Sequence, residues 1–472
     1  MNLPRDKKGN WVLNSGKTLK IEGTSNCPLA ILWPGNVVAL PGSKLIMKNV
    51  IAKPMVPTRA ASINLFGGKG NAVFDDISAI GSVTYGMGGN HILENIAVFN
   101  FGDNSEDINA ITCVGLGPNN TFNNIEISGS RDDGIELFEC ALNIKGNLKI
   151  DGALDDYFDA DFGDQSTIDN LICSVTSDTP QNGNSMVELG GSPSRAVLGK
   201  KTTTKIKSFQ MRGTFIPDGE PIVNYKTGSV PKPLAINVVP GTQFKVVGSS
   251  SLKSNLALPG LLIGQQGSLV TLENVSVTAE TFASDEAGVL LLGRGKEFEF
   301  NDFVDAGYGP FPYGINKEGG PHKLNNVDLT GLGSNNKDLN ALTLVGLHTD
   351  STINKVDVKN SKDDGIEIFN GNVDVTNCTV DNAFDDAFDV DSGYIGNVKG
   401  LKIVSTTNTK SLIEVGGDTE SRETIPNFIG QVNISGTVST TEEKVNVKDN
   451  AAIKFNGKLL TPNNYDNILE IN

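Results

Sequence analysis

The chain has 472 residues, of which 20% are charged and 6% aromatic, and its formal net charge is −16. This acidic excess would repel phosphate-rich partners, so we expect neither nucleic acid nor an anionic membrane surface as a partner. No stretch of about 18 apolar residues is present, which predicts no membrane insertion.

Short alternations of apolar and polar residues begin after a polar lead-in of residues 1–12. They appear at residues 16–21 and 41–50, each behind a glycine-containing turn, and they continue along the chain. Such alternation predicts β-strands, and helical periodicity is absent. Apolar positions recur about 22 to 24 residues apart, as from Ile125 to Leu148. One coil of a parallel β-solenoid has about this length. We therefore predict an all-β fold, a right-handed parallel β-helix of roughly twenty coils.

An internal duplication divides the sequence. Residues 91–110 match residues 322–341 without a gap, at an offset of 231. The proline-rich stretch between Pro217 and Pro233 interrupts the strands and is the predicted joint. The predicted domains are a first half with its lead-in, a second half, and a C-terminal cap that blocks the open edge of the last coil. They span residues 1–226, 227–450 and 451–472.

Two acidic phrases lie one coil apart and recur in the second half. Residues 130–138 read SRDDGIELF and residues 154–161 read LDDYFDAD, and their counterparts are residues 361–369 and 384–391. Successive coils stack roughly 4.8 Å apart, so acids at equivalent positions should form columns. The predicted columns are Asn109, Asp133, Asp156 and Thr112, Glu136, Asp159. Stacked carboxylates repel one another, so we expect something to offset that cost.

Three uses of these acids remain open. Calcium, or another hard cation, takes six to eight oxygen ligands and would neutralise the repulsion. Glycoside hydrolysis needs two carboxylates about 5 to 10 Å apart, which neighbouring coils supply. A structural ladder would instead bond the acids to turn amides and to Arg131 or Lys362. The predicted metal ligands are Asp132, Asp133, Asp155, Asp156, Asp159, Asp161, Asp363, Asp364, Asp385, Asp386, Asp389 and Asp391.

A catalytic role would fall to Glu136 with Asp159, and to Glu367 with Asp389. An acid/base pair needs carboxyls in different environments, one of them kept protonated near neutral pH. Alternation places these side chains on an outward strand face with no predicted aromatic wall to exclude water. We therefore assign no catalytic residue, and the sequence favours a protein without enzymatic activity over an enzyme.

The remaining candidates have simpler interpretations. His91 and His322 occupy equivalent positions before a strand, where we predict turn or capping roles. The five cysteines have no metal-ligand spacing and are predicted to be buried small hydrophobes without a disulfide framework. The aromatic turn Tyr308–Gly314 is expected either to stack on a sugar ring or to pack over the flank of the solenoid.

The acidic phrases resemble a known family. The pattern D-D-G-I-E-x-F, followed one coil later by D-D-x-F-D-x-D and a glycine-containing turn, is similar to the right-handed β-helix surface proteins of Bacteroidetes-type bacteria. Residues 339–346 resemble the lead-in of that family. The resemblance implies an exported β-helix but defines little of its biochemistry. The general architecture is also similar to phage tailspikes and virion spikes, whereas only the Asp-Asp dipeptide is shared with polygalacturonases.

The expected function follows from this resemblance. We expect a surface-exposed virion spike, or an adhesin-like protein of a bacterial cell surface, that contacts a glycan or a host receptor. The alternatives are a polysaccharide lyase or glycosidase and a purely structural capsid or appendage subunit. Other virion or surface proteins are expected partners, and a homo-oligomer such as a trimer is a further expectation. Residues 1–10 contain no apolar signal-peptide region, so we expect that a signal was removed or that the protein leaves its cell by lysis.

Overall fold

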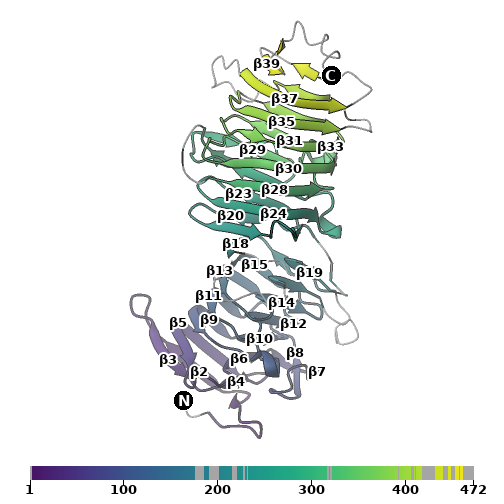
Figure 1. The fold of residues 1–472 in the computed structure, drawn as a ribbon. Coiled ribbons are helices and arrows are strands. Elements are labelled where there is room, and N and C mark those ends of the chain that lie inside the picture. The colour runs from purple at the N-terminus through teal and green to yellow at the C-terminus, as the bar shows by residue number, and fades with distance from the viewer. Residues whose placement is uncertain are drawn as a thin grey trace. The chain divides into compact units, whose positions relative to one another are not determined.

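The structure is a computed structural model, and its strands form two parallel β-helical units (Figure 1). Contacts within the chain define unit 1 as residues 1–212 with 218–231, and unit 2 as residues 213–217 with 232–472. The described residues are 3–175, 185–190, 201–214, 221–226, 229–230, 232–315, 318, 321–391, 393–404, 409 and 411–416. Beyond these, only the backbones of the strands between residues 431 and 460 are described. The predicted cap at residues 451–472 lies outside the described residues except for β39 (Ala452–Phe455) and β40 (Lys458–Leu460).

Each coil of unit 1 contributes one short strand to an eight-stranded parallel sheet, here called sheet A. Its strands are β1 (Trp11–Leu13), β4 (Asn36–Ala39), β6 (Ser62–Phe66), β10 (Ile111–Val114), β12 (Ile135–Phe138), β14 (Phe158–Asp161), β16 (Val187–Leu189) and β19 (Val223–Tyr225). Ile63, Ile111, Ile135 and Phe158 lie opposite one another in register and are fully buried. This apolar column fills the inside of the coil.

Longer strands form the remaining faces of unit 1. They are β5 (Lys44–Pro54), β9 (Ile92–Phe99), β11 (Thr121–Ser128), β13 (Asn143–Asp151) and β15 (Thr167–Val175). The shorter β2 (Thr18–Glu22) and β3 (Leu29–Trp33) pair with successive halves of β5. The two short strands β17 (Lys205–Ile206) and β18 (Phe209–Thr214) follow β15.

An asparagine ladder marks the corner inside these long strands. Asn49, Asn95 and Asn124 all have a positive φ, between 51° and 52°. The side-chain amide of Asn95 donates to Asn49 Oδ1 at 3.1 Å, and that of Asn124 donates to Asn95 Oδ1 at 3.1 Å. Asparagine tolerates the left-handed conformation because its side chain hydrogen-bonds locally. The ladder recurs in unit 2 between Asn274 and Asn326. It was not predicted from the sequence.

Replacing a rung of the ladder tests its contribution. Asn124→Ala loses the bonds to Asn95 and to the backbone N–H of Asn147. It also places alanine, which has no side-chain hydrogen bond to offset the backbone strain, at φ 51°. With about 1 kcal/mol for each bond and for the strained backbone, the expected loss of unfolding free energy is roughly 2 to 3 kcal/mol. Urea denaturation measures it. Asn124→Gly, which relieves only the backbone strain, should lose less, and an equal loss would contradict the strain component.

Unit 2 repeats the same order of strands. Its counterparts of sheet A are β20 (Ile236–Val238), β23 (Leu261–Gly264), β25 (Gly288–Leu292), β29 (Leu342–Val345), β31 (Ile366–Phe369), β34 (Asp386–Asp391), β36 (Ser411–Val415) and β38 (Val445–Val447). The other faces are formed by β21 (Gln243–Val247), β22 (Ser254–Leu258), β24 (Leu269–Ala279), β28 (Lys323–Thr330), β30 (Thr352–Ser361), β32 (Val375–Thr376), β33 (Thr379–Ala383), β35 (Asn397–Val404) and β37 (Gln431–Ser439). The described part of the chain contains only short 3-10 helices, η1 (Asn104–Glu106), η2 (Thr281–Ala283) and η3 (Asn335–Lys337). The prediction of an all-β parallel β-helix is confirmed.

The step of 22 to 24 residues holds only in part of each unit. Glu136 lies opposite Asp159, and Glu367 lies opposite Asp389, as predicted. However, Ile63 pairs with Ile111, and Val289 with Leu342, because a hairpin is inserted in each of these coils. The prediction of about twenty coils is therefore too high.

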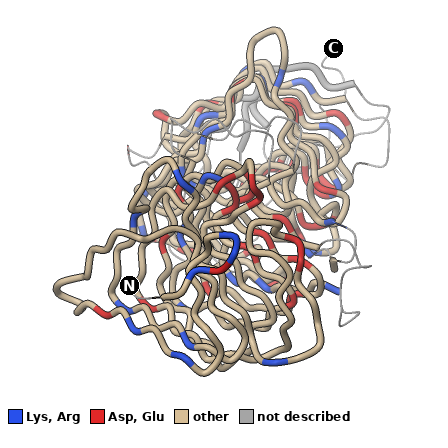
Figure 2. Tube along the Cα trace, turned by 90° about the horizontal axis from the view of Figure 1, so that it is seen from below, with Lys and Arg blue, Asp and Glu red and all other residues tan. Residues whose placement is uncertain are grey.

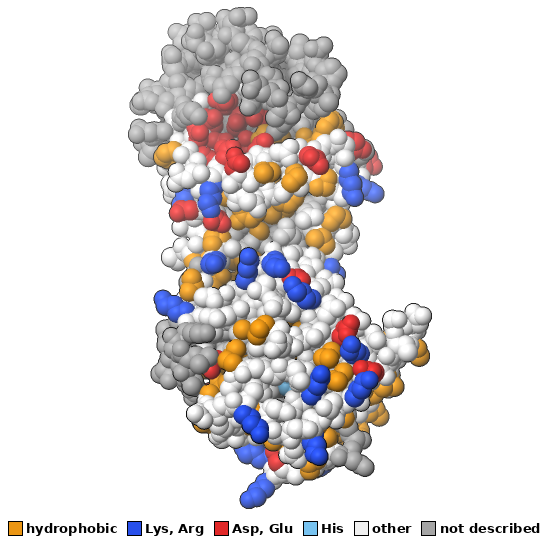
Figure 3. All heavy atoms as spheres, turned by 180° about the vertical axis from the view of Figure 1, so that it is seen from behind, with side chains coloured by type: hydrophobic (Ala, Val, Ile, Leu, Met, Phe, Trp, Pro, Cys, Tyr) orange, Lys and Arg blue, Asp and Glu red, His pale blue; other side chains and the backbone are white. Residues whose placement is uncertain are grey.

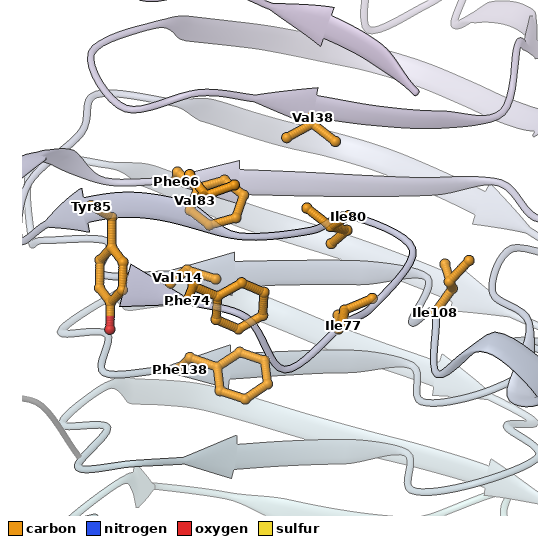
Figure 4. Packing of buried hydrophobic residues seen from close by; sticks show 10 residues of the cluster. All are labelled: Val38, Phe66, Phe74, Ile77, Ile80, Val83, Tyr85, Ile108, Val114 and Phe138. Carbon is orange, nitrogen blue, oxygen red and sulfur yellow. The ribbon is translucent and has the colours of Figure 1, made fainter. Parts of the chain in front are cut away.

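The inserted hairpins cover the outer face of the sheet. In unit 1, β7 (Gly68–Phe74) and β8 (Val83–Gly86) place Phe74, Ile77 and Tyr85 against Phe66, Val114 and Phe138 of sheet A (Figure 4). A Cβ at Gly67, where this hairpin begins, would collide with the carbonyl oxygen of Gly115. The close approach therefore requires glycine.

In unit 2, β26 (Phe298–Phe300) and β27 (Phe311–Tyr313) form the equivalent hairpin. Tyr313 is only 2% exposed and packs among Phe300, Phe369 and other buried apolar residues. The aromatic turn Tyr308–Gly314 thus packs over the flank of the solenoid, which was one of its two expected roles.

The two equivalent histidines connect neighbouring coils. His91 Nδ1 accepts from the backbone N–H of Leu45 at 3.0 Å, and its Nε2 donates to the carbonyl of Phe66. His322 makes the same pair of bonds with Val270 and Leu292. Burial lowers the pKa of both imidazoles, to about 4 for His322. They are buried connectors between coils, so the predicted turn or capping role is wrong.

The cysteines are free, and four of the five are buried, as predicted; Cys27 is exposed. No helix in the described part of the chain is long and apolar enough to cross a membrane.

Candidate functional site: two buried acidic clusters

An acidic column runs across sheet A of unit 1. In register, Thr112 lies opposite Glu136, Glu136 opposite Asp159, and Asp159 opposite Glu188. Strict alternation places these side chains on the outer face, because Ile135 and its neighbours fill the interior. Figure 2 shows that acidic positions gather in short segments of adjacent coils.

The column is buried, although it lies on the outer face. Glu136 is 9% exposed and Asp159 is 7% exposed. The expectation of an open strand face is therefore wrong. Alternation in a sequence tells which face a side chain occupies, but not what encloses that face.

The turns before the strands add further carboxylates. Asp133 Oδ1 accepts from the backbone N–H of Asp156 at 2.8 Å, which links two coils. Single carboxylate oxygens of Asp133, Glu136 and Asp159 all lie within 4.8 Å of one another, and Asp132, Asp133 and Asp155 form a similar group. Cluster 1 consists of Asp132, Asp133, Glu136, Asp155, Asp156, Asp159 and Glu188.

Unit 2 contains an equivalent site. Asp364 Oδ1 accepts from the N–H of Asp386 at 2.7 Å, and oxygens of Asp364, Glu367 and Asp389 lie within 4.8 Å of one another. On the face shown in Figure 3, acidic side chains form a dense patch in the second half of the chain. Cluster 2 consists of Asp363, Asp364, Glu367, Asp385, Asp386, Asp389 and Glu414.

A neutral amide occupies the same place in both clusters. The side-chain N–H₂ of Asn109 donates to Glu136 Oε2 and, at 3.3 Å, to Thr112 Oγ1. Asn340 donates in the same way to Glu367 and Thr343. The amide oxygens of both asparagines are buried and have no hydrogen-bond partner among the described residues. Each cluster therefore contains a buried neutral oxygen with free acceptor capacity.

Several carboxylate oxygens of the clusters are also buried without a hydrogen-bond partner among the described residues. Asp132 Oδ2 and Asp159 Oδ1 in cluster 1, and Asp363 Oδ2 and Asp389 Oδ1 in cluster 2, are buried without a hydrogen-bond partner within the described ranges. Leaving buried acceptors unsatisfied costs about 1 to 3 kcal/mol each. They recur at equivalent positions in the two clusters, so both sites could accept a hydrogen-bond donor or a cation.

Burial also changes the acidity of the clusters. Desolvation, followed by repulsion from neighbouring carboxylates, raises the pKa of Glu136 and Asp159 well above the usual range. The same causes raise the pKa of Asp156 to about 9 and that of Asp132 to about 7. Without a cation, these clusters hold protons near neutral pH.

Basic side chains do not neutralise the clusters in the predicted way. Arg131 donates to the carbonyls of Pro57 and Arg59, and Lys362 bonds to Ser284 and Asp285. The predicted ladder with Arg131 and Lys362 as partners of the acids is therefore wrong, although the bonds from turn amides are present. Lys226, which the sequence analysis did not single out, lies 3.1 Å from Glu188 Oε2.

The donor set fits a hard cation. Calcium binds oxygens at about 2.3 to 2.6 Å, so ligands on opposite sides of one ion are about 5 Å apart. The 4.8 Å span of each carboxylate group is compatible with that geometry. The groups contain oxygen ligands without histidine or cysteine, which favours calcium or magnesium over the softer transition metals.

The structure brings the predicted metal ligands of each half together, with some at the edges. Asp155 and Asp385 are half-buried, and Asp161 and Asp391 lie two residues further along the strands of Asp159 and Asp389. Glu188 and Glu414 continue the columns but were not predicted to be site residues. The signal that could have identified them is their equivalent place in the matching phrases V-E-L-G-G and I-E-V-G-G.

Comparison with known proteins relates part of the second unit to a known family model. Residues 266–467 match the family model described as pectate-lyase like beta helix domain. No curated protein and no solved structure matches the chain significantly. The matched segment contains cluster 2, so the similarity to pectate-lyase-like β-helix domains extends over the acidic site of unit 2. This architecture supports many functions, and the function must be argued from the site.

Proposed function

We propose that the protein is an extracellular surface protein, of a virion or a bacterial cell, that holds calcium at clusters 1 and 2 and binds glycan there without cleaving it. The observation that supports this most strongly is the duplication of a buried, oxygen-only cluster with unsatisfied acceptors at equivalent positions in both units. A turn ladder alone would not need Asn109 and Asn340 to leave their amide oxygens unbonded.

Calcium provides the link to a glycan. The ion takes six to eight oxygens, and the carboxylates at the edges, Asp155 and Asp385, are half-buried. An ion at this edge retains coordination positions for water or for the hydroxyl and carboxylate groups of a sugar. Two such sites on one chain add avidity when both reach the same polymer.

Cleavage of the glycan is the second candidate function. The burial of Glu136 and Asp159 favours it, because both carboxyls are enclosed and desolvation raises the pKa of each. An acid/base pair, however, needs environments that push its two pKa values apart. Here desolvation and like charges raise the pKa of both members, so binding is the better-supported role.

Binding and cleavage assays separate the two functions. Surface polysaccharides from bacteria are incubated with the full chain in calcium or in EGTA. Bound polymer is measured, and chain length is followed by size-exclusion chromatography and a reducing-end assay. We expect calcium-dependent binding with no shortening, and at least roughly tenfold weaker binding by Asp159→Asn/Asp389→Asn, because charged ligands are removed from both clusters.

The matched control is Asp75→Asn/Asp305→Asn, which removes two exposed acids outside the clusters. It should bind like the unaltered protein. Binding that is indifferent to EGTA would reject the role of calcium. Fragmentation that disappears in Glu136→Gln/Glu367→Gln would establish the enzyme instead.

A further inference from the structure

A separate cavity of about 350 Å³ opens in unit 1, and no residue of cluster 1 lines it. It lies between the lead-in, the start of β4, the segment after β5 and helix η1. Its size is within the range of pockets that bind small molecules. Its lining includes Arg5, Trp11, Trp33, Arg59, Asp103 and Glu106.

Both tryptophans of the chain line this cavity. Trp33 is fully buried, and its indole N–H donates to the carbonyl of Ser62 at 3.0 Å. Trp11 is half-buried, and its indole N–H donates to the carbonyl of Pro34 at 3.3 Å. The partly open Trp11 ring is therefore held in place by its polar edge, and its aromatic surface also contacts the guanidinium of Arg5.

The equivalent positions of unit 2 show that the coil does not need these tryptophans. Trp33 lies opposite Pro54 as Leu258 lies opposite Ala279. In the sheet, Trp11 occupies the position at the start of the column that Ile236 occupies in unit 2. Aliphatic residues thus build the same coil in unit 2. Trp33 packs against Phe101 inside unit 1, whereas the half-buried Trp11 can present part of its ring to the cavity.

The charges of the cavity differ from those of the whole protein. The net charge of the chain is −16, yet Arg5, Lys8 and Arg59 line the cavity with only two carboxylates. The guanidinium carbon of Arg5 lies 4.4 Å from the centre of the Trp11 ring. Neither Arg5 nor Arg59 forms an ion pair with any described residue. Two guanidinium groups without ion pairs can bind a carboxylate with charge-assisted hydrogen bonds.

The acidic residues of the cavity lie on the segment of η1, which also contacts cluster 1. Asp103 Oδ1 accepts from the N–H and hydroxyl of Ser105, so one of its oxygens remains available to a ligand hydroxyl. Next to it, Asn104 donates to Asp132 Oδ1 at 3.3 Å. The cavity therefore adjoins cluster 1 within the same unit.

We infer that this cavity binds an acidic sugar unit, with its carboxylate on Arg5 and Arg59, its ring on Trp11 and its hydroxyls at Asp103 and Glu106. The combination of an aromatic ring, two guanidinium groups and nearby carboxylates in one cavity matches the three parts of such a ligand. The site shares its class of ligand with the proposed function, but it requires neither calcium nor the acidic clusters.

Tryptophan fluorescence tests this inference directly, because both indoles of the chain line the cavity. The full-length protein in EGTA is titrated with glucuronic acid and, separately, with glucose, which has the same ring without the carboxylate. We expect a saturable change in fluorescence with glucuronic acid and at least tenfold weaker binding of glucose. Equal binding of both sugars, or no saturable change with glucuronic acid, overturns the inference.

Variants locate the site and distinguish it from the proposed function. Isothermal titration calorimetry should show at least tenfold weaker binding of glucuronic acid by Arg59→Ala and by Trp11→Ile, which introduces the residue that unit 2 has there. Lys296→Ala, an exposed cation of unit 2, should bind normally. Asp159→Asn/Asp389→Asn should also bind normally, so failure of the calcium clusters leaves this result unchanged. Unaltered affinity in both Arg59→Ala and Trp11→Ile would reject the cavity as the site.

Discussion

Saturating calcium is expected to raise the melting temperature of the protein by roughly 5 to 10 °C, and EGTA is expected to remove this gain. A ligand at a hundredfold excess over its dissociation constant stabilises the folded state by about 2.7 kcal/mol per site. For domains of about this size, 1 kcal/mol shifts the melting temperature by roughly 2 to 4 °C. Each unit contains one cluster, so the gain applies to each unit whether or not the two unfold together.

The physical reason is the state of the clusters without an ion. Carboxylates from adjacent coils then repel one another, and Asp159 Oδ1 and Asp389 Oδ1 remain buried without a partner. A cation satisfies these oxygens and removes the repulsion, which the unfolded chain does not experience.

Differential scanning calorimetry in calcium, magnesium and EGTA measures the effect. Asp159→Asn/Asp389→Asn should melt at the same temperature in calcium and in EGTA, because the substitution removes a charged ligand from each cluster. Asp75→Asn/Asp305→Asn should retain the full calcium gain. Identical melting curves of the unaltered protein in calcium and EGTA would leave the clusters as structural ladders.

The sequence was sufficient to predict the coil and the acidic register. The alternation at Ile135 to Leu137 and the step from Glu136 to Asp159 depend on residues close in sequence, and both are confirmed by strand pairing. The recurrence of Glu136 as Glu367 also predicted that the site is duplicated. Local patterns of this kind survive folding because every coil uses the same backbone geometry.

Other features depended on contacts that the sequence does not display. The burial of Glu136 results from its surroundings in three dimensions rather than from alternation. Glu188 was missed because the step from Phe158 to Val187 is longer than the coil repeat. The cavity of unit 1 joins residues between Arg5 and Glu106 that share no pattern in the sequence.

The acidity of the clusters predicts how stability depends on pH. Burial raises the pKa of Asp132 and of Asp363 to about 7 and that of Asp156 to about 9, from the ordinary aspartate value of 3.8. Between the unfolded pKa of 3.8 and each raised pKa, the folded protein binds more protons than the unfolded chain, so its stability falls as pH rises. In metal-free buffer, the unfolding free energy should therefore be largest near pH 4 and should decrease through pH 7 to 9.

Calcium should reverse this trend, because the ion binds deprotonated carboxylates and competes with protons. The stabilisation by calcium should be small near pH 4 and should grow as the carboxylates ionise. Urea denaturation at intervals from pH 4 to 9, with and without calcium, measures both curves. Each pKa unit corresponds to about 1.4 kcal/mol, so the fall in the metal-free protein should reach several kcal/mol.

A double variant identifies the groups responsible for part of the fall between pH 4 and 7. Asp132→Asn/Asp363→Asn removes the two carboxyls whose folded-state pKa lies at about 7, and it should reduce the slope of the metal-free curve between pH 4 and 7. The later fall towards pH 9 should remain, because Asp156 and the other buried acids of the clusters still titrate. Stability that increases from pH 4 to 8 without metal would contradict the burial of protonated acids, since groups with a lowered pKa, such as His91 and His322, would then outweigh them.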